Sequence, residues 1–199
     1  MVAPAAMMVK ICGITNRDDA VAAVEAGASA IGFNFYRDSP RYISPTGAAM
    51  IAEKIPEQVW KVGVFVGEPA DTVAKIALEV GLDVAQLHGM SEARGLRIWR
   101  ALPADARIPE MLTDGSEALL IDTPSEDLLG GTGNTWDWNR AKNHAWKLII
   151  AGGLDASNVR QAIDAARPWG VDACSRLEKS PGLKDHEKMR NFIKAARGE

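Results

Sequence analysis

The chain has 199 residues, of which 47% are hydrophobic and 25% are charged, and its formal net charge is -3. This composition is typical of a globular protein and favours a single folded domain. Basic residues are scattered and outnumbered by acidic ones, which argues against a nucleic-acid-binding protein. Apolar runs fall short of the roughly 18 to 20 residues of a membrane-spanning helix, which argues against insertion in a membrane.

The first residues and the two cysteines indicate where the protein works. Residues 1–7 are small and apolar, but they lack a basic start and are too short for a signal peptide. We expect them to form a frayed tail before a single domain at residues 8–199. A disulfide between Cys12 and Cys174 is one alternative, but without an export signal a reduced, cytoplasmic chain with two free thiols is favoured.

Short β-branched runs alternate along the chain with longer segments of helical period. The pattern predicts strands at 9–12, 30–35, 61–66, 83–87, 98–101, 118–122, 148–151 and 171–174. It predicts helices at 18–26, 47–55, 70–80, 158–166 and 185–196. Residues 90–97 leave room for about two turns of helix at most.

Eight strand repeats predict an α/β fold, a compact (β/α)8 TIM barrel with a closed, parallel, eight-stranded sheet. An open doubly wound sheet is the alternative, but no Gly-x-Gly-x-x-Gly motif follows the first strand. The first and last strands of a closed barrel are neighbours. We therefore expect Cys12 and Cys174 to lie close enough to oxidise in vitro.

Six groups of residues stand out in order along the chain: Lys10-Ile-Cys-Gly-Ile-Thr15; Ser39-Pro-Arg-Tyr42; Gln86-Leu-His-Gly89; Asp122 with Gly130-Gly-Thr-Gly133 and Trp136-Asp-Trp138; Ala151-Gly-Gly-Leu154 with Asn158; and Gly170-Val-Asp172 through Asp185. Together they resemble the motif series of the phosphoribosylanthranilate isomerase family. The resemblance runs from Lys10 to the C-terminus. It implies a (β/α)8 barrel that converts N-(5'-phosphoribosyl)anthranilate to 1-(2-carboxyphenylamino)-1-deoxyribulose 5-phosphate in tryptophan biosynthesis, with no metal and no organic cofactor.

This Amadori rearrangement needs an acid that protonates the ribose ring oxygen and a base that removes the proton from C2'. By the resemblance, Asp122 is the general acid and Cys12 is the general base. Cys12 must then be largely thiolate, which requires a lowered pKa. The alternatives are a buried core thiol for Cys12 and, for Asp122, a carboxyl that caps a turn through Thr123.

Neighbouring charges are expected to tune both groups. Lys10 lies two positions before Cys12 on one strand, so the two side chains share a face. We hypothesise that Lys10 favours the thiolate, while Asp172 on the last strand neutralises Lys10. Partial burial beside an aromatic ring is expected to raise the pKa of Asp122.

Other residues are expected to bind or line the substrate. Arg41 suits two-pronged binding of the anthranilate carboxylate, although a solvated surface arginine is the alternative. Gln86 and His88 alternate on one strand and share a face, but His88 could equally be a hydrogen-bonded interior group. By the resemblance, the loop after the Asp122 strand also lines the site, through Gly131, Thr132 and Gly133.

The loops after the seventh and eighth strands are expected to bind the substrate phosphate. The residues concerned are Gly152, Gly153, Ser175 and Arg176. The family usually has Ser-Ser-Gly-Val-Glu in the second loop, so Arg176 replaces a glycine. This puts in doubt a positive φ at residue 176; Arg176 would instead add a cation for the phosphate or pair with a nearby acid.

Two other functions compete with this interpretation. One is the histidine-pathway isomerase that rearranges a different aminoaldose, although that family has two aspartates and Cys12 argues against it. The other is a catalytically silent barrel that binds a phosphorylated ligand. The expected partner is a small phosphorylated aminoaldose, with neither nucleic acid nor membrane, and a monomer is favoured over a homodimer. We also expect Trp60 and Trp99 to cover surface that a longer helix at 90–97 would hide.

Overall fold

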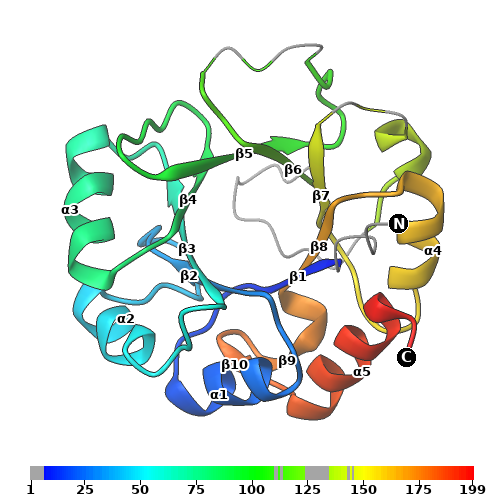
Figure 1. The fold of residues 1–199 in the computed structure, drawn as a ribbon, viewed down its shortest axis with the longest axis horizontal. Helices are drawn as coiled ribbons and strands as arrows, with labels where there is room; N and C mark the ends of the chain where they lie inside the picture. Colours follow the sequence, from blue (N-terminus) through cyan, green and yellow to red (C-terminus); the bar gives the residue numbers. More distant parts are fainter. Residues whose placement is uncertain (1–6, 110–111, 113, 124–134, 143, 145) are drawn as a thin grey trace.

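The computed structural model describes residues 7–109, 112, 114–123, 135–142, 144 and 146–199. Eight parallel strands form a closed barrel, because β1 pairs with β2 on one side and with β8 on the other (Figure 1). The strands are β1 (Met8–Ile11), β2 (Ala30–Asn34), β3 (Trp60–Val66), β4 (Val84–His88), β5 (Arg97–Pro103), β6 (Ala118–Asp122), β7 (Lys147–Ile150) and β8 (Gly170–Ala173). The predicted closed parallel barrel is confirmed.

Five α-helices among the described residues surround the barrel (Figure 1). They are α1 (Arg17–Glu25), α2 (Pro45–Ala52), α3 (Ala70–Val80), α4 (Val159–Ala166) and α5 (His186–Arg197). Local sequence starts several of them: Ser44 caps α2 before Pro45, and Asp185 accepts the first free N–H groups of α5. Residues 89–96 contain no helix, in agreement with the short segment predicted there.

Alternation along the strands separates two apolar layers. Val9 and Ile11 of β1 point outward and belong to the larger cluster, which lies under the helices. Met8, Ala118 and Leu120 belong to a smaller cluster with Trp99. The smaller cluster fills the barrel interior, as the register of the strands requires.

Three tryptophans close the interior at the start of the strands. The ring centroids of Trp60, Trp99 and Trp169 lie 5.8 to 5.9 Å apart, within the range of favourable aromatic pairs. Trp99 is fully buried and packs with the inner cluster. The expectation that Trp99 covers outer surface is therefore wrong, because β5 turns Trp99 inward and Arg100 outward.

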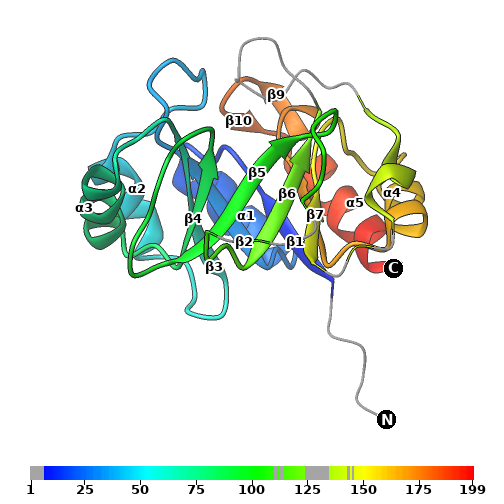
Figure 2. The same ribbon diagram turned by 90° about the horizontal axis from the view of Figure 1, so that it is seen from above.

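Several short elements were not anticipated from the sequence. They are the 3-10 helices η1 (Trp138–Ala141) and η2 (Ser175–Leu177) and the antiparallel pair β9 (Glu178–Ser180) and β10 (Leu183–Lys184). Figure 2 shows β9 and β10 at the end of the barrel to which the strand arrows point. This hairpin therefore lies at the end where (β/α)8 barrels carry their active sites.

Some predictions lie outside the described residues. These are Gly131, Thr132 and Gly133, and residues 1–6 of the expected tail. Met7, the last residue of that tail, is partly buried and packs against the core. The single domain at residues 8–199 stays a prediction. In the part of the chain that the structure describes, no helix is long and apolar enough to cross a membrane.

Candidate active site

The carboxyl ends of β1 and β8 bring two thiols together. Lys10 and Ile11 pair with Asp172 and Ala173, and the backbone N–H of Cys12 donates to the carbonyl oxygen of Ala173 at 3.0 Å. The same register continued by one residue sets Cys12 beside Cys174. Both cysteines are free thiols.

Gly13 makes room for the side chains around Cys12. A Cβ atom at this position would lie 2.9 Å from Arg41 Cδ and 2.9 Å from Cys174 Sγ, and the backbone has a φ of 72°. A larger residue would meet both the steric conflict and the backbone strain. The glycine of the Lys10-to-Thr15 motif therefore lets the Arg41 stem and the Cys174 thiol approach this strand end.

The surroundings of Cys12 favour its thiolate. Its pKa is lowered from 9.0 to about 7, chiefly by a hydrogen bond from Cys174 and further by the charge of Lys10, against the opposing effect of burial. Lys10 is fully buried, and its Nζ lies 2.9 Å from Asp172 Oδ2. The expected Lys10–Asp172 pair is thus present, whereas the larger effect of Cys174 was not anticipated.

Asp122, at the end of β6, has the opposite tendency. Its pKa is raised from 3.8 to about 6 by burial and by the negative charge of Asp172. The backbone N–H of Thr123 donates to Asp122 Oδ1 at 2.7 Å and partly opposes this rise. Burial was the expected cause, and Asp172 is an additional one. The Asp122 carboxyl therefore makes the local turn contact with Thr123 and still has a raised pKa.

Residues from three strand ends line one pocket next to Asp122. Its lining includes Asp122, Gly152, Gly153, Cys174, Ser175 and Arg176. Gly152 has a φ of 86°, and a Cβ on it would lie 2.8 Å from Asp122 Oδ1 and closer still to Thr123. The four predicted phosphate-binding residues are therefore gathered around one pocket, beside the candidate acid.

The structure removes the doubt about the backbone at Arg176. This residue lies in η2, and among the described non-glycine residues the one with a positive φ is Arg167, at 49°. The Arg176 guanidinium donates from Nη1 to Asp155 Oδ2 at 3.0 Å. Of the two roles considered for it, pairing with a nearby acid is observed.

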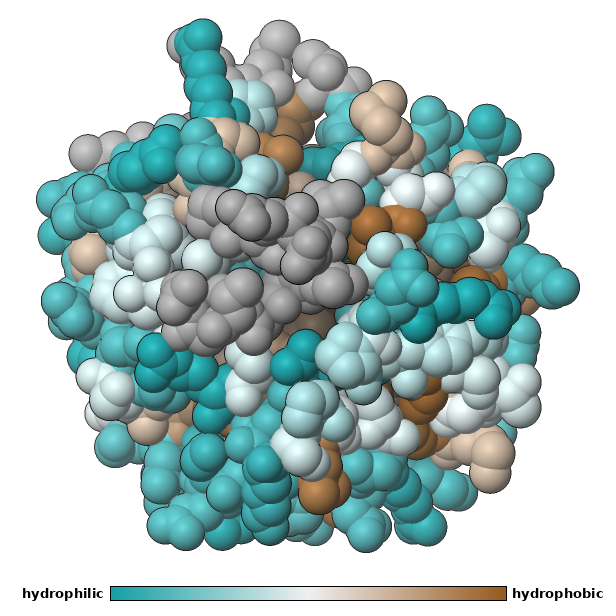
Figure 3. Space-filling model, turned by 180° about the vertical axis from the view of Figure 1, so that it is seen from behind, coloured by the Kyte–Doolittle hydropathy of each residue, from teal (hydrophilic) through white to brown (hydrophobic). Residues whose placement is uncertain are grey.

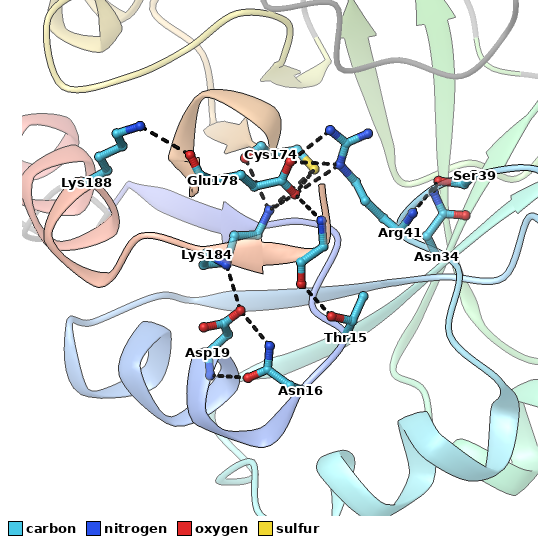
Figure 4. A network of polar contacts seen from close by, with 11 residues as sticks. Thr15, Asn16, Asp19, Asn34, Ser39, Arg41, Cys174, Glu178, Lys184 and Lys188 are labelled. Atoms are coloured by element: carbon cyan, nitrogen blue, oxygen red, sulfur yellow. Dashed lines mark hydrogen bonds and ion pairs between the residues drawn. The ribbon is translucent and has the colours of Figure 1, made fainter. Parts of the chain in front are cut away.

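Arg41 is buried, so the alternative of a solvated surface arginine is wrong. Its Nε and Nη2 donate to the carboxylate of Glu178 at 2.9 to 3.2 Å (Figure 4). Lys184 Nζ also donates to Glu178 Oε1, at 2.9 Å. The sequence placed Glu178 in the loop expected to bind the phosphate but did not indicate its contacts with Arg41 and Lys184, although opposite charges on both sides of Pro181-Gly182 are compatible with a hairpin pair.

Gln86 and His88 contact each other. Gln86 Nε2 lies 3.0 Å from His88 Nε2, so the two side chains share a face as predicted. Burial and the charges of Lys10 and Arg100 lower the pKa of His88 to about 4. His88 is therefore neutral near pH 7 and is hydrogen-bonded inside the barrel. Among the described residues, no three His, Cys, Asp or Glu side chains are grouped to hold a metal ion.

Comparisons with known proteins agree with this geometry. Residues 9–195 match the family model of N-(5'-phosphoribosyl)anthranilate (PRA) isomerase. The N-(5'-phosphoribosyl)anthranilate isomerase of Solibacter usitatus is 48% identical, over 96% of this chain and 98% of that protein. The crystal structure of phosphoribosyl anthranilate isomerase from Thermotoga maritima has a TM-score of 0.84 and 37% identity, over 97% of this chain and all of that one.

A second Thermotoga maritima structure holds a ligand. It is the complex with reduced 1-(o-carboxyphenylamino)-1-deoxyribulose 5-phosphate, with a TM-score of 0.81 and 36% identity, over 97% of this chain and all of that one. A third structure is of monomers generated from that enzyme, which is described as dimeric.

Proposed function

Because the chain belongs to the N-(5'-phosphoribosyl)anthranilate isomerase family, we propose that it catalyses the Amadori rearrangement of N-(5'-phosphoribosyl)anthranilate to 1-(2-carboxyphenylamino)-1-deoxyribulose 5-phosphate. One observation carries the proposal. A buried thiol with a lowered pKa and a half-buried carboxyl with a raised pKa lie at the carboxyl ends of β1 and β6 in one barrel. Opposite pKa shifts of two groups are typical of an acid and base pair.

The reaction divides into two proton transfers. Asp122, as general acid, gives its proton to the ribose ring oxygen while the C1'–O bond breaks, and the anilino nitrogen supplies the electron pair that forms the iminium. Cys12, as thiolate, then removes the proton from C2', and the C–H electrons form the enolamine and neutralise the iminium. The enol then tautomerises to the ketone. No metal or organic cofactor takes part in this mechanism.

The pKa values suit these roles. A thiol with a pKa of about 7 is substantially ionised near neutral pH, which a general base requires. A carboxyl with a pKa of about 6 keeps a protonated fraction there, which a general acid requires. The positive charge of Lys10 stabilises the thiolate, and the carboxylate of Asp172 neutralises Lys10. The ion pair therefore brings little net charge into the barrel.

The same strand ends support substrate binding. Arg41 is proposed to bind the anthranilate carboxylate, and Gln86 and His88 to line the site. Gly152, Gly153 and Ser175 are proposed to bind the phosphate through backbone N–H groups and the serine hydroxyl. Arg176 is paired with Asp155, so we propose that it acts on the phosphate through its charge.

The chemistry of the proposed thiolate and the surface of the protein bear on where the protein acts and in what form. We propose a cytoplasmic enzyme, because catalysis by a thiolate needs a reducing environment. We also favour a monomer over a homodimer. On the face opposite that of Figure 1, the residues coloured in Figure 3 are mostly hydrophilic, with apolar ones scattered between them. Scattered apolar residues are usual on monomers.

The test follows turnover of freshly generated phosphoribosylanthranilate by fluorescence under reducing conditions. We expect activity in the wild type and its loss in Cys12→Ala and in Asp122→Asn, with circular dichroism confirming that both variants fold. Turnover of the histidine-pathway aminoaldose instead would select that rival function. Binding of the product analogue without turnover would select the silent barrel.

A further inference from the structure

Glu178 lies at the centre of a buried cluster of charges near the end of β8. Its carboxylate accepts from Arg41 Nε and Nη2, from Lys184 Nζ at 2.9 Å, and from the backbone N–H of Gly182 at 3.3 Å (Figure 4). The three charged side chains are almost completely shielded from solvent. Buried carboxylates with this many donors are held in one orientation.

The pair leaves part of the guanidinium for another partner. Arg41 uses the edge formed by Nε and Nη2 for Glu178. The planar guanidinium has a second edge, formed by its two Nη groups, which can bind a further carboxylate with two parallel hydrogen bonds. The Arg41 stem passes directly over Gly13, next to Cys12. The pair with Glu178 therefore fixes a cation beside the proposed base.

Glu178 is itself held by the docking of the β9–β10 hairpin. The backbone N–H of Lys184 donates to Asp19 Oδ2 at 2.8 Å, and the hydroxyl of Thr15 donates to the carbonyl oxygen of Gly182. Asp19 also accepts from Asn16 Nδ2 at 2.7 Å. Contacts of the hairpin with α1 and with the loop after β1 therefore fix the position of the Glu178 carboxylate.

The charges in the cluster do not cancel. Arg41 and Lys184 are cations, and among the described residues Glu178 is the one carboxylate that both contact directly. These three residues together carry one excess positive charge. This excess charge lies beside the proposed Cys12 thiolate and behind the second edge of the Arg41 guanidinium, where a ligand carboxylate would bind.

We propose that Glu178 is a positioning residue that holds Arg41 for the ring carboxylate of the substrate and so sets specificity for carboxylate-bearing ligands. This inference rests on the proposed function, in which Arg41 binds that carboxylate. In the rival interpretation, Glu178 competes with the ligand carboxylate for the Arg41 guanidinium, and removal of Glu178 strengthens ligand binding. The sign of the change therefore decides between positioning and competition.

The experiment compares two ligands in wild type and Glu178→Gln. One is the reduced product analogue with its ring carboxylate, and the other is the same compound with an unsubstituted phenyl ring. By calorimetry, we expect Glu178→Gln to bind the first roughly 10-fold or more weakly, and the second within about threefold of wild type. With substrate, KM should rise much more than kcat falls.

Three further variants test whether the effect of Glu178→Gln comes from a change in folding and whether it acts through Arg41. Lys188→Met is the matched control, because Lys188 Nζ donates to the backbone oxygen of Glu178, at 3.2 Å, outside the carboxylate cluster, and the ratio of the two affinities should be unchanged. The double variant Glu178→Gln, Lys184→Met removes both buried charges and keeps the test available if the single variant does not fold. Combined with Arg41→Met, Glu178→Gln should add little further loss.

The outcomes separate the inference from the function. Equal losses for both ligands, or tighter binding of the carboxylate-bearing one, would overturn the positioning role while wild-type turnover leaves the isomerase intact. Additive losses in the double variant with Arg41→Met would do the same. Failure of wild type to bind either analogue or to turn over substrate would overturn the proposed function, and this inference with it.

Discussion

Lys10 on β1 and Asp172 on β8 form a buried ion pair with 2.9 Å between Nζ and Oδ2. The pair joins the first strand of the barrel to the last, and Cys12 and Cys174 lie two residues further along the chain, directly after these strands end. The ion pair that helps to stabilise the Cys12 thiolate therefore lies between the two strands whose pairing closes the barrel.

Removal of Lys10 should raise the pKa of Cys12. Lys10→Met deletes a cation that stabilises the thiolate and leaves the buried Asp172 charge unbalanced, and both changes disfavour ionisation. The rate of iodoacetamide alkylation of Cys12 against pH measures this pKa in a Cys174→Ser background. Lys10→Met, Asp172→Asn should show a smaller rise, because it removes both charges. An unchanged pKa in Lys10→Met would rule out the role of this lysine.

The dependence of kcat/KM on pH should be bell-shaped, with its maximum between about 6 and 7. The productive enzyme has protonated Asp122 and ionised Cys12, whose pKa values are about 6 and about 7. The thiolate fraction is lost as the pH falls, and the protonated carboxyl is lost as the pH rises. Both limbs should appear in stopped assays across pH 5 to 9, roughly the range that brackets both values. A flat profile over that range would contradict the assignment.

Loss of the Cys174 thiol should weaken the ionisation of Cys12. Its hydrogen bond is the largest contribution that lowers the pKa of Cys12. Cys174→Ala should therefore raise the pKa of Cys12 more than Cys174→Ser, whose hydroxyl can still donate. Ultraviolet absorbance of the thiolate against pH gives both values, with Cys12→Ala as the blank. Equal pKa values in all three proteins would show that Cys174 has no influence.

The tryptophan cluster should contribute strongly to stability. Trp99→Ala removes a fully buried ring from the barrel interior and should lower the free energy of unfolding by about 3 to 5 kcal/mol. Trp99→Phe keeps most of the packing and removes a buried indole N–H that has no hydrogen-bond partner in the part of the chain that the structure describes, so its loss should be clearly smaller. Urea unfolding of both variants measures this difference. Similar losses in the two variants would contradict it.

Sequence periodicity was sufficient for the barrel and for part of the site. Strand period and loop position indicated that Lys10 and Asp172 would meet, because both follow from the adjacency of the first and last strands. The contacts of Arg41 could not be predicted in this way. They depend on a hairpin that docks through Asp19 and Thr15, and no local pattern specifies that docking.

The placement of Trp99 was mistaken for a related reason. The segment Arg97-Ile-Trp-Arg-Ala101 alternates as a strand with Trp99 and Ala101 on one side, which was compatible with the interior. The short segment before it suggested instead an uncovered outer surface. Once the strands close into a barrel, the alternation determines that Trp99 points into the interior, because every second side chain must point inward.

The distance along the strands between the tryptophans and the polar strand ends also has an evolutionary consequence. Trp60, Trp99 and Trp169 pack at the start of the strands, whereas Cys12, Asp122 and Arg41 gather at their far end. A substitution among the three rings alters robustness to mutation without touching the reacting atoms. Substitutions at the carboxyl ends of the strands can therefore change ligand preference. The tryptophans at the opposite end provide the excess stability that offsets the destabilisation such substitutions cause.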